Sequence, residues 1–392
     1  MANKRNQTAK KAARAAENAA KKNPKVFFSV IAILLVIVIV AGLLWYFLVY
    51  KKKPAPPAFA TDEISIHFLE LGNKYVGDCT LVKIGNTEVL IDAGSKNNSA
   101  STLISYINEY CTDGTLEYVI ATHAHEDHIG AFYSTSSERG IFESFDCKTI
   151  IDFAKTKKEN KPTSVYGKYV AARDAEVNSG AKHYTALECW NNENGAQRTY
   201  ALAENVTMSI LYQKYYEEFD SGTGENNYSV CVLITQGIYN YLFTGDLEEK
   251  GEISLVESNS LPQCKLYKGG HHGSKTSSSD KLLSVIKPET VCICTCAGTP
   301  EYPSDASQFN PENAFPAQAT IDRISKYTDK IYVTSLAVDI VLEPKKSWNV
   351  VSMNGNIVVR SNGIDFSVTG SNHSLILKET EWFKANRTWS GV

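Results

Sequence analysis

The stretch YVIATHAHEDH, residues 118–128, holds three imidazoles and two carboxylates within its last six positions. Its apolar start, residues 118–121, predicts a buried strand, so the polar cluster at 123–128 follows a strand end. Imidazole nitrogen and carboxylate oxygen atoms together suit zinc, and also manganese or iron. The chain has only 8 histidines in 392 residues. Three of them beside Asp127 therefore favour a metal site over a polar loop that holds histidines by chance.

Three other apolar runs also end in residues of the kinds that bind metals. The segment LIDAG, residues 90–94, places Asp92 directly after a predicted strand. YLFTGD, residues 241–246, ends in Asp246, and LYKGGHHGS, residues 266–274, carries His271 and His272. Four strand ends of this kind predict one shared sheet edge at which all the clusters meet.

Strands and helices are expected around these clusters. The dipeptide Gly85-Asn86 between two apolar runs predicts a tight hairpin. Residues 154–228 are more polar, and we interpret them as covering loops with one helix. Strands are predicted at 64–69, 80–84, 87–91, 228–235, 239–244, 264–268, 290–296, 348–352, 356–360, 364–368 and 374–377, and helices at 99–110, 166–177, 278–286 and 317–327.

At this point the chain resembles the metallo-β-lactamase superfamily, and most of all the hydrolase domain of ComEC-type DNA-uptake proteins and their stand-alone relatives. The matching segments occur in family order over roughly residues 62–370. They are IHFLELG from Ile66, GDCTLVKIG from Gly77, EVLIDAG from Glu88, THAHEDHIGAF from Thr122, NNYSVCVLI from Asn226, YLFTGDLE from Tyr241, GGHHGSKTSSSDKLL from Gly269 and NGNIVVRSNGI from Asn354.

The resemblance implies an α/β (α+β) fold, a four-layer αββα sandwich over residues 62–375, with two divalent ions at one edge. Zinc is expected, with manganese as the alternative. One of His271 and His272 completes the second site, and we favour His272 because Gly273 and Ser274 follow it. By position, His123 and His125 would bind the first ion, Asp127, His128 and His272 the second, and Asp246 both.

The same resemblance assigns chemical roles. Asp92 would hold a ligand imidazole, or else cap a turn. Two ions about 3.5–4 Å apart can share a hydroxide as nucleophile, which Asp127 and Asp246 would orient. His271 or a metal-bound water would protonate the leaving group. Ser274 and Lys275 would contact a phosphate oxygen, or else form an ordinary helix start.

Two departures from the family pattern stand out. Many relatives supply a third histidine to the first ion, and here only His183 lies in the middle of the chain. Its surroundings predict a surface or core histidine, so the first ion would be weakly held or absent. A histidine before the proline of a late helix is replaced by Phe315. The sequence therefore predicts no histidine contact with the substrate at that position.

The N-terminal part has a different character. Residues 26–50 carry no charge, and such a run exceeds the roughly 20 residues that cross a bilayer as a helix. A cleaved signal peptide ending at Ala58-Phe59-Ala60 is the rival, but its apolar core would span only about 7–15 residues. We therefore predict a basic arm at 1–25, a transmembrane helix at 26–50, a linker at 51–61 and a C-terminal tail at 376–392.

Charge predicts the orientation of this segment. Eight basic residues precede it and three lysines follow it, which places the N-terminus in the cytoplasm and the rest outside. The whole chain has 40 basic and 43 acidic residues. Without these eleven basic residues and the one acidic residue of the arm, 29 basic and 42 acidic residues remain. Such an acidic body repels polyanions. The nine cysteines form no disulfide framework, and Cys292, Cys294 and Cys296 are expected on a core face.

These features predict a membrane-anchored, extracytoplasmic, metal-dependent hydrolase of phosphodiester or phosphoester bonds. The motifs favour nucleic acid as substrate, whereas the anchor and acidic body favour a cell-envelope polymer, cleaved as by teichoic-acid or phosphorylcholine esterases. A β-lactamase-like hydrolase is a weaker alternative, since the segment HHGSKTS is unlike the corresponding metal-ligand segment of the β-lactamases in this superfamily. A non-catalytic envelope binding module is the alternative of another class. The membrane and the substrate are the expected partners, and no protein partner is predicted.

Overall fold

The computed structural model describes Lys25, Ser29, Ala32, Ile39, Val40 and residues 63–392 apart from 220, 221, 223, 302–309 and 342–346. The chain divides into two units, residues 1–58 and 59–392, and the fold below is that of the second. Nearly all of the predicted arm, transmembrane segment and linker lies outside the described residues. In the part that is described, no helix has the length and apolar character to cross a bilayer.

Two eight-stranded mixed sheets form the second unit. The hairpin predicted at Gly85-Asn86 is present, and it joins β2 and β3 in antiparallel register. From β3 to β6 the neighbouring strands run parallel. The first sheet has the order β16 (Phe366–Gly370), β15 (Ile357–Ser361), β1 (Ile64–Phe68), β2 (Thr80–Ile84), β3 (Thr87–Ile91), β4 (Thr115–Ile120), β5 (Asp146–Asp152) and β6 (Lys182–Thr185).

The second sheet is parallel in its middle, where β10, β11, β12 and β13 lie side by side. Antiparallel strands complete it at both ends. Its order is β14 (Ser347–Ser352), β13 (Ile331–Val341), β12 (Val291–Ala297), β11 (Leu266–Lys268), β10 (Tyr239–Phe243), β9 (Cys231–Gln236), β8 (Val206–Leu211) and β7 (Thr199–Ala203).

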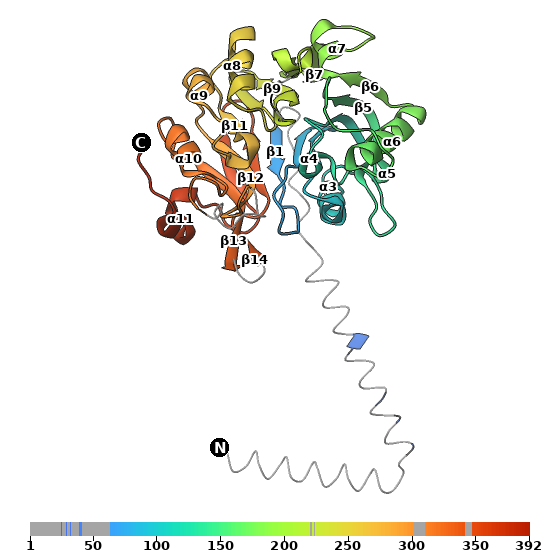
Figure 1. Cartoon of the computed structure of the whole chain (residues 1–392). Helices are drawn as coiled ribbons and strands as arrows, with labels where there is room; N and C mark the ends of the chain where they lie inside the picture. Colours follow the sequence, from blue (N-terminus) through green and yellow to red (C-terminus); the bar gives the residue numbers. More distant parts are fainter. Residues whose placement is uncertain are drawn as a thin grey trace. The chain divides into compact units, whose positions relative to one another are not determined.

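Helices flank the two sheets. Figure 1 shows α3 to α6 beside the first sheet and α8 to α10 on the opposite side, with the sheets between them. Ser279 caps α9 through its hydroxyl. The helices are α3 (Ala100–Ile107), α4 (Glu126–Ile129), α5 (Ile141–Ser144), α6 (Val165–Asn178), α7 (Ala186–Asn191), α8 (Glu249–Ser258), α9 (Asp280–Ile286), α10 (Gln318–Ile324) and α11 (Glu381–Asn386), with 3-10 turns η2 (Asn97–Ser99), η3 (Lys214–Tyr216), η4 (Asn226–Tyr228), η5 (Gly270–Gly273) and η7 (Leu377–Glu379).

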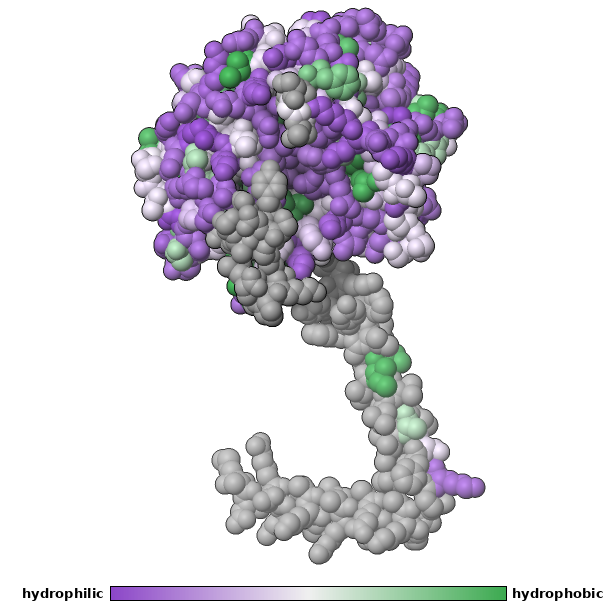
Figure 2. Space-filling view, in the orientation of Figure 1, coloured by the Kyte–Doolittle hydropathy of each residue, from purple (hydrophilic) through white to green (hydrophobic). Residues whose placement is uncertain are grey.

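The main hydrophobic core lies between the sheets. It combines residues of β1 to β5 with residues of β8 to β12, Phe68 and Phe243 among them, whose rings stack at 6.4 Å. A second core packs α8 to α11 on the outer face of the second sheet. All nine cysteines are free and buried, and the expectation that Cys292, Cys294 and Cys296 face a core is confirmed. Figure 2 shows a mostly hydrophilic surface on the second unit, with isolated hydrophobic residues.

Several sequence-based expectations were wrong in detail. The strand predicted at 374–377 is absent, because residues 374–376 form an irregular segment before η7. Residues 154–228 contain β6, β7, β8 and α7 besides the predicted helix α6. Their alternation of apolar and polar residues is short and was hidden by the high polarity of the region. Residues 376–392 contain η7 and α11, and Leu377 and Phe383 are buried in the second core.

Candidate metal centre

The four clusters found in the sequence meet at one edge of the two sheets. Asp92 follows β3, and the cluster at 123–128 follows the parallel neighbour β4. In the second sheet Asp246 follows β10, and His271 and His272 follow its parallel neighbour β11. The carboxyl ends of parallel neighbours share an edge of a sheet, so this topology brings all four clusters together.

Backbone contacts fix the loop that carries the histidines. The carbonyl oxygen of Asp127 accepts a hydrogen bond from the amide of Asp78, and the amide of Ala93 donates to the carbonyl of His128. A side chain on Gly94 has no room, because a Cβ there would lie 1.6 Å from the Asp127 carbonyl oxygen. The glycine of LIDAG therefore allows the close approach of two strand-end loops.

Left-handed backbone conformations also occur at this edge. Asp92, His271 and His272 have φ angles of 61°, 47° and 52°. Non-glycine residues rarely adopt such angles, which cost of order 1–3 kcal/mol each and cluster at functional sites. The strain is consistent with a site whose side-chain directions matter more than local backbone energy.

Four ligand-type atoms converge beside Asp246. Its Oδ2 lies 3.1 Å from Nε2 of His128 and 3.3 Å from Nε2 of His272. Nε2 of His272 also lies 3.4 Å from Oδ2 of Asp127. His128, His272 and Asp246 are buried, whereas Asp127 is partly exposed. This arrangement is the one expected for the second ion.

Each of the two imidazoles is held from behind by a carboxylate. Nδ1 of His128 lies 2.8 Å from Oδ2 of Asp92, which also accepts hydrogen bonds from Thr122. Nδ1 of His272 lies 3.3 Å from Oδ1 of Asp78 and 3.1 Å from the carbonyl oxygen of Cys294. A proton held at Nδ1 leaves the Nε2 lone pair free for a metal, so these partners fix the tautomer that a ligand needs.

A buried cation accompanies these carboxylates. Lys268 forms an ion pair with Asp78, and its Nζ lies 4.0 Å from Oδ1 of Asp246. Burial of the ammonium group lowers the pKa of Lys268, but Asp78 and Asp246 outweigh this effect and raise the pKa above its ordinary value. Lys268 is therefore a fixed positive charge beneath the site.

The charge pattern prepares the site for a cation. Burial opposes a charged imidazole, but Asp246 and Asp92 outweigh it and raise the pKa of His128 well above its ordinary value. Asp246 and Asp78 do the same for the pKa of His272. Burial opposes the charge of Asp246, yet His128 and His272 hold the pKa of that carboxyl well below its usual range. Protons on the imidazoles thus balance the acids, and a metal would replace them.

The donor set fits a divalent metal ion. Among the described residues, Nε2 of His128, Nε2 of His272 and Oδ1 of Asp246 are buried and form no hydrogen bond of good geometry, although both Nε2 atoms lie within 3.3 Å of Oδ2 of Asp246. Buried polar atoms without a well-formed hydrogen bond are costly unless another group binds them. Asp78, His128, Asp246 and His272 offer atoms that all lie within 4.8 Å of one another, and of these four residues Asp78 is already engaged by Lys268 and by Nδ1 of His272. Nitrogen and carboxylate oxygen donors in this number suit zinc or manganese.

The expected first ion has fewer donors. Nε2 of His123 lies 3.0 Å from Nδ1 of His125 and 4.0 Å from Oδ2 of Asp246. Burial and the neighbouring His128 lower the pKa of His123 well below its ordinary value, and burial lowers the pKa of His125 to about 4. Both imidazoles are therefore neutral and able to bind a metal.

His183 does not complete this first site. Its Nε2 lies 2.9 Å from Oδ1 of Asp152, which Arg173 also contacts at 2.8 Å. The expectation that His183 is an ordinary structural histidine is confirmed. Two imidazoles and the Asp246 carboxylate thus remain as donors for the first ion among the described residues.

A cavity of about 370 Å³ opens onto the cluster. His271 lines it, with Nδ1 3.1 Å from the Thr276 hydroxyl and Nε2 3.7 Å from Oδ2 of Asp246. Phe315 also lines it, 5.7 Å from the His272 ring, so an aromatic ring takes the place of the histidine expected there. The other lining residues are Tyr75, Val76, Ser95, Lys96, His125, Glu126, Asp127, Asn226, His272, Thr299, Pro300, Glu301 and Trp348.

The structure does not bring Ser274 and Lys275 to this cavity. Ser274 is buried and bonds to Thr276 and Glu301, and Nζ of Lys275 donates to Asn313 at 2.6 Å. Neither residue lines the cavity. The alternative prediction, that Ser274 and Lys275 start a helix, also differs from the structure, because the N-cap of α9 is Ser279.

Comparison with known proteins agrees with this geometry. Residues 72–137, which include the cluster at 123–128, match the model of the metallo-beta-lactamase superfamily. The chain contains a metallo-β-lactamase superfamily domain. The predicted resemblance is thereby confirmed, and the mixed α/β fold with two sheets is the fold of this domain.

Curated relatives of the metallo-β-lactamase domain include competence proteins. ComE operon protein 3 of Bacillus subtilis is 35% identical over 181 residues, which is 45% of this chain and 20% of that protein. Competence protein ComA of Neisseria gonorrhoeae is 24% identical over 259 residues, 64% of this chain and 30% of that protein. The chain thus spans less than a third of the length of these relatives.

Solved structures similar to this metallo-β-lactamase domain are more distant. The metallo-beta-lactamase fold protein YhfI from Bacillus subtilis has 11% sequence identity and a TM-score of 0.37, and the match covers 74% of this chain and 99% of that one. A metallo-beta-lactamase from Cronobacter sakazakii, a HARLDQ motif mutant, has 14% identity and a TM-score of 0.31, covering 50% and 74%. At this level of similarity, superposition says nothing about residue roles.

Sequence reasoning missed three residues of the metallo-β-lactamase site. Asp78 and Lys268 both lie inside motifs quoted above, GDCTLVKIG and LYKGGHHGS. The available signal was a charged residue just before one buried strand and at the end of another. Asn226 lines the cavity, and its Nδ2 lies 3.5 Å from Nε2 of His271. Nothing in its local sequence distinguishes it from a turn residue.

Proposed function

We propose that this chain is a metal-dependent hydrolase of phosphodiester bonds. The observation that carries the proposal is the buried convergence of His128, His272 and Asp246 on one point that opens to a cavity. Both imidazoles are oriented by carboxylates at Nδ1, which is costly to arrange in a protein that binds no metal. The competence relatives support the substrate class, which their partial coverage leaves as part of the proposal.

Different residues would carry the separate steps of this hydrolysis. Bound divalent ions would supply Lewis acidity and lower the pKa of a water molecule. Asp127, which is partly exposed at the cavity, would accept a proton from that water and orient it. His271 would give a proton to the leaving oxygen, since this residue lines the cavity while Thr276 holds its Nδ1. Glu301, with Oε1 3.9 Å from Nε2 of His271, would keep that ring in place.

A phosphocholine-type ester of a cell-envelope polymer is a second candidate substrate. The cavity holds the aromatic side chains of Phe315 and Trp348 together with the carboxylates of Glu126 and Glu301. Aromatic faces and acids together recognise quaternary ammonium groups. Nucleic acid would instead use Lys96, the cation of the cavity wall, which lies 4.0 Å from the Tyr75 ring centre.

The proposal also places the enzyme on the outer side of a membrane, held by residues 26–50. Its support is the length of that uncharged run and the excess of basic residues before it. Protease treatment of intact cells tests this placement. Digestion of the body, with the N-terminal arm protected, is expected, whereas full protection of the body would contradict it.

A hydrolysis assay tests the enzymatic part. The full-length chain, loaded with zinc or manganese, is expected to cleave bis-p-nitrophenyl phosphate, and chelation should abolish turnover. Asp127→Asn is expected to lower kcat by about 10²-fold or more. Glu204→Gln, a change of similar chemistry in the exposed turn between β7 and β8, should have no effect.

The substrate arms of this assay separate the candidates. Single-stranded DNA, RNA, a phosphocholine ester and the β-lactam nitrocefin are compared at equal enzyme concentration. No metal-dependent turnover of any phosphoester would overturn the proposal. Cleavage of nitrocefin alone would assign the lactamase-like chemistry, and cleavage of the phosphocholine ester alone would assign the second candidate.

A further inference from the structure

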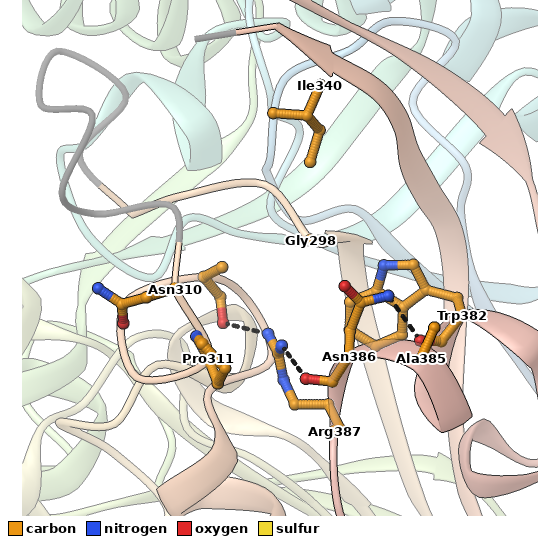
Figure 3. Close-up of a pocket in the computed structure, with 9 residues that line it drawn as sticks. Gly298, Asn310, Pro311, Ile340, Trp382, Ala385, Asn386 and Arg387 are labelled. Carbon is orange, nitrogen blue, oxygen red and sulfur yellow. Dashed lines mark hydrogen bonds between the residues drawn. The ribbon is translucent and has the colours of Figure 1, made fainter.

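A second cavity, of about 340 Å³, lies outside the metal site. Figure 3 shows the guanidinium of Arg387 between the Asn310–Pro311 side of this cavity and the residues of α11, with Ile340 set apart from them. The lining residues are Gly298, Asn310, Pro311, Ala314, Ile340, Trp382, Ala385, Asn386 and Arg387. None of them belongs to the candidate metal centre.

Arg387 is unusual among the charged residues of the chain. Only 8% of its surface is exposed. Among the described residues no carboxylate forms an ion pair with it, and its printed partners are the carbonyl oxygens of Pro316, Asn386 and Ala314 at 3.1, 2.9 and 3.1 Å. Burial lowers the pKa of Arg387 to about 10, and the Glu312 carboxylate opposes this shift only in part, so Arg387 remains charged at neutral pH. A buried charge without a counter-ion is expensive.

The hydrogen bonds of Arg387 leave a pair of donors. Nε, Nη1 and Nη2 each give one N–H group to a carbonyl oxygen, so one N–H group remains on each terminal nitrogen. Two such donors on one guanidinium suit the oxygen atoms of a carboxylate or phosphate group. The ring of Trp382, 4.9 Å from the guanidinium carbon, covers one face of the group and limits its contact with water.

The cavity shares a wall with the metal site. The amide of Gly298 donates to the carbonyl of Phe315 at 2.6 Å, and the amide of Phe315 donates to the carbonyl of Thr299 at 2.9 Å. Gly298 and Ala314 face the Arg387 cavity, whereas Thr299 and Phe315 face the metal site. Adjacent residues of two paired segments thus line different cavities.

We infer that the Arg387 cavity binds a small oxyanion, a carboxylate or phosphate group held by the two remaining N–H groups of the guanidinium. The ligand supplies a counter-charge that no ion pair among the described residues provides, and the cavity volume admits a group of this size with part of its carrier. The inference does not depend on the proposed hydrolase activity. The competing role of Arg387 is purely structural, as a link between α11 and residues 314–316.

Binding to the metal-free, full-length chain distinguishes these roles. Inorganic phosphate and acetate are titrated separately by calorimetry in the presence of chelator, with chloride at matched ionic strength as control. Saturable binding of phosphate or of acetate is expected, and the anion that binds identifies the source of the oxygens. Absence of saturable binding for both anions would overturn the inference and leave Arg387 a structural link.

Two variants locate the binding. Ala385→Glu places a carboxylate on an exposed residue in the wall of the same cavity and is expected to weaken anion binding at least tenfold. Ala385→Gln has the same shape without the charge and should retain wild-type affinity. Arg387→Gln should lose binding as well, with the Ala385 pair as the safeguard if it folds poorly. Equal affinity in Ala385→Glu and Ala385→Gln would contradict the assignment to this cavity.

Discussion

Nδ1 of His272 lies 3.3 Å from Oδ1 of Asp78, a carboxylate that is buried together with its ion-pair partner Lys268. This contact turns the lone pair on Nε2 of His272 toward Asp246 and Asp127. It repeats, for the imidazole that follows β11 of the second sheet, the contact between His128 and Asp92. Each sheet thus provides one imidazole, and both orienting carboxylates come from the first sheet, Asp78 before β2 and Asp92 after β3.

Removal of the buried ammonium group is expected to destabilise the protein strongly. Lys268→Met leaves the Asp78 carboxylate buried without its cation, and such breaks cost about 3–5 kcal/mol. Urea denaturation of the metal-free chain measures the free energy of unfolding. The double variant Lys268→Met/Asp78→Asn should recover a large part of the loss, because neither charge remains. A double variant no more stable than the single one would show that Lys268 acts in another way.

The convergence of these side chains was predictable because the residues follow strand ends in short, specific motifs. Asp92, His128, Asp246 and His272 are all placed where the motifs predicted. The orienting role of Asp78 was not predictable, because it depends on the pairing of the start of β2 with the end of β3. The strands β5 to β8 were missed since their burial comes from tertiary packing and not from long apolar runs.

The two adjacent histidines of η5 are expected to differ in function. His272→Ala removes an atom of the converging set and should lower zinc affinity by about 100-fold or more. His271→Ala should keep bound zinc but lose most of the turnover, since His271 lines the cavity together with Asn226. Zinc content and kcat, measured on both variants, give the split. The reverse pattern would exchange the roles of the two residues.

A methyl group at Gly94 is expected to disturb the histidine loop. The added Cβ would meet the carbonyl oxygen of Asp127 at 1.6 Å, so the loop must move. Overpacking of this kind costs about 3 kcal/mol and should displace Asp127 and His128. Thermal unfolding and zinc content of Gly94→Ala are compared with Gly114→Ala, where a Cβ has open space. The control, at a positive φ, should lose about 1 kcal/mol and no zinc.

Acid sensitivity of the fold is expected to arise partly at His67. This buried side chain contacts Tyr106 and Ser65, and burial, with Arg360 nearby, lowers the pKa of His67 from 6.5 to about 3. A lowered histidine pKa stabilises the fold above pH 6.5 and loses that contribution as the pH falls toward 3. Between pH 6.5 and 5 the loss is about 2 kcal/mol. Unfolding free energies at both pH values should fall more in wild type than in His67→Gln, and equal slopes would contradict the account.

The most direct test of the metal site is the zinc content of the full-length chain after dialysis against metal-free buffer. Mass spectrometry determines this content. The arrangement of His128, His272 and Asp246 predicts about one tightly bound zinc ion or more per wild-type chain. The double variant His128→Ala/His272→Ala should bind none, while Glu204→Gln binds as wild type. Wild-type protein without zinc, or a double variant that retains it, would contradict the claim that these residues form a metal site.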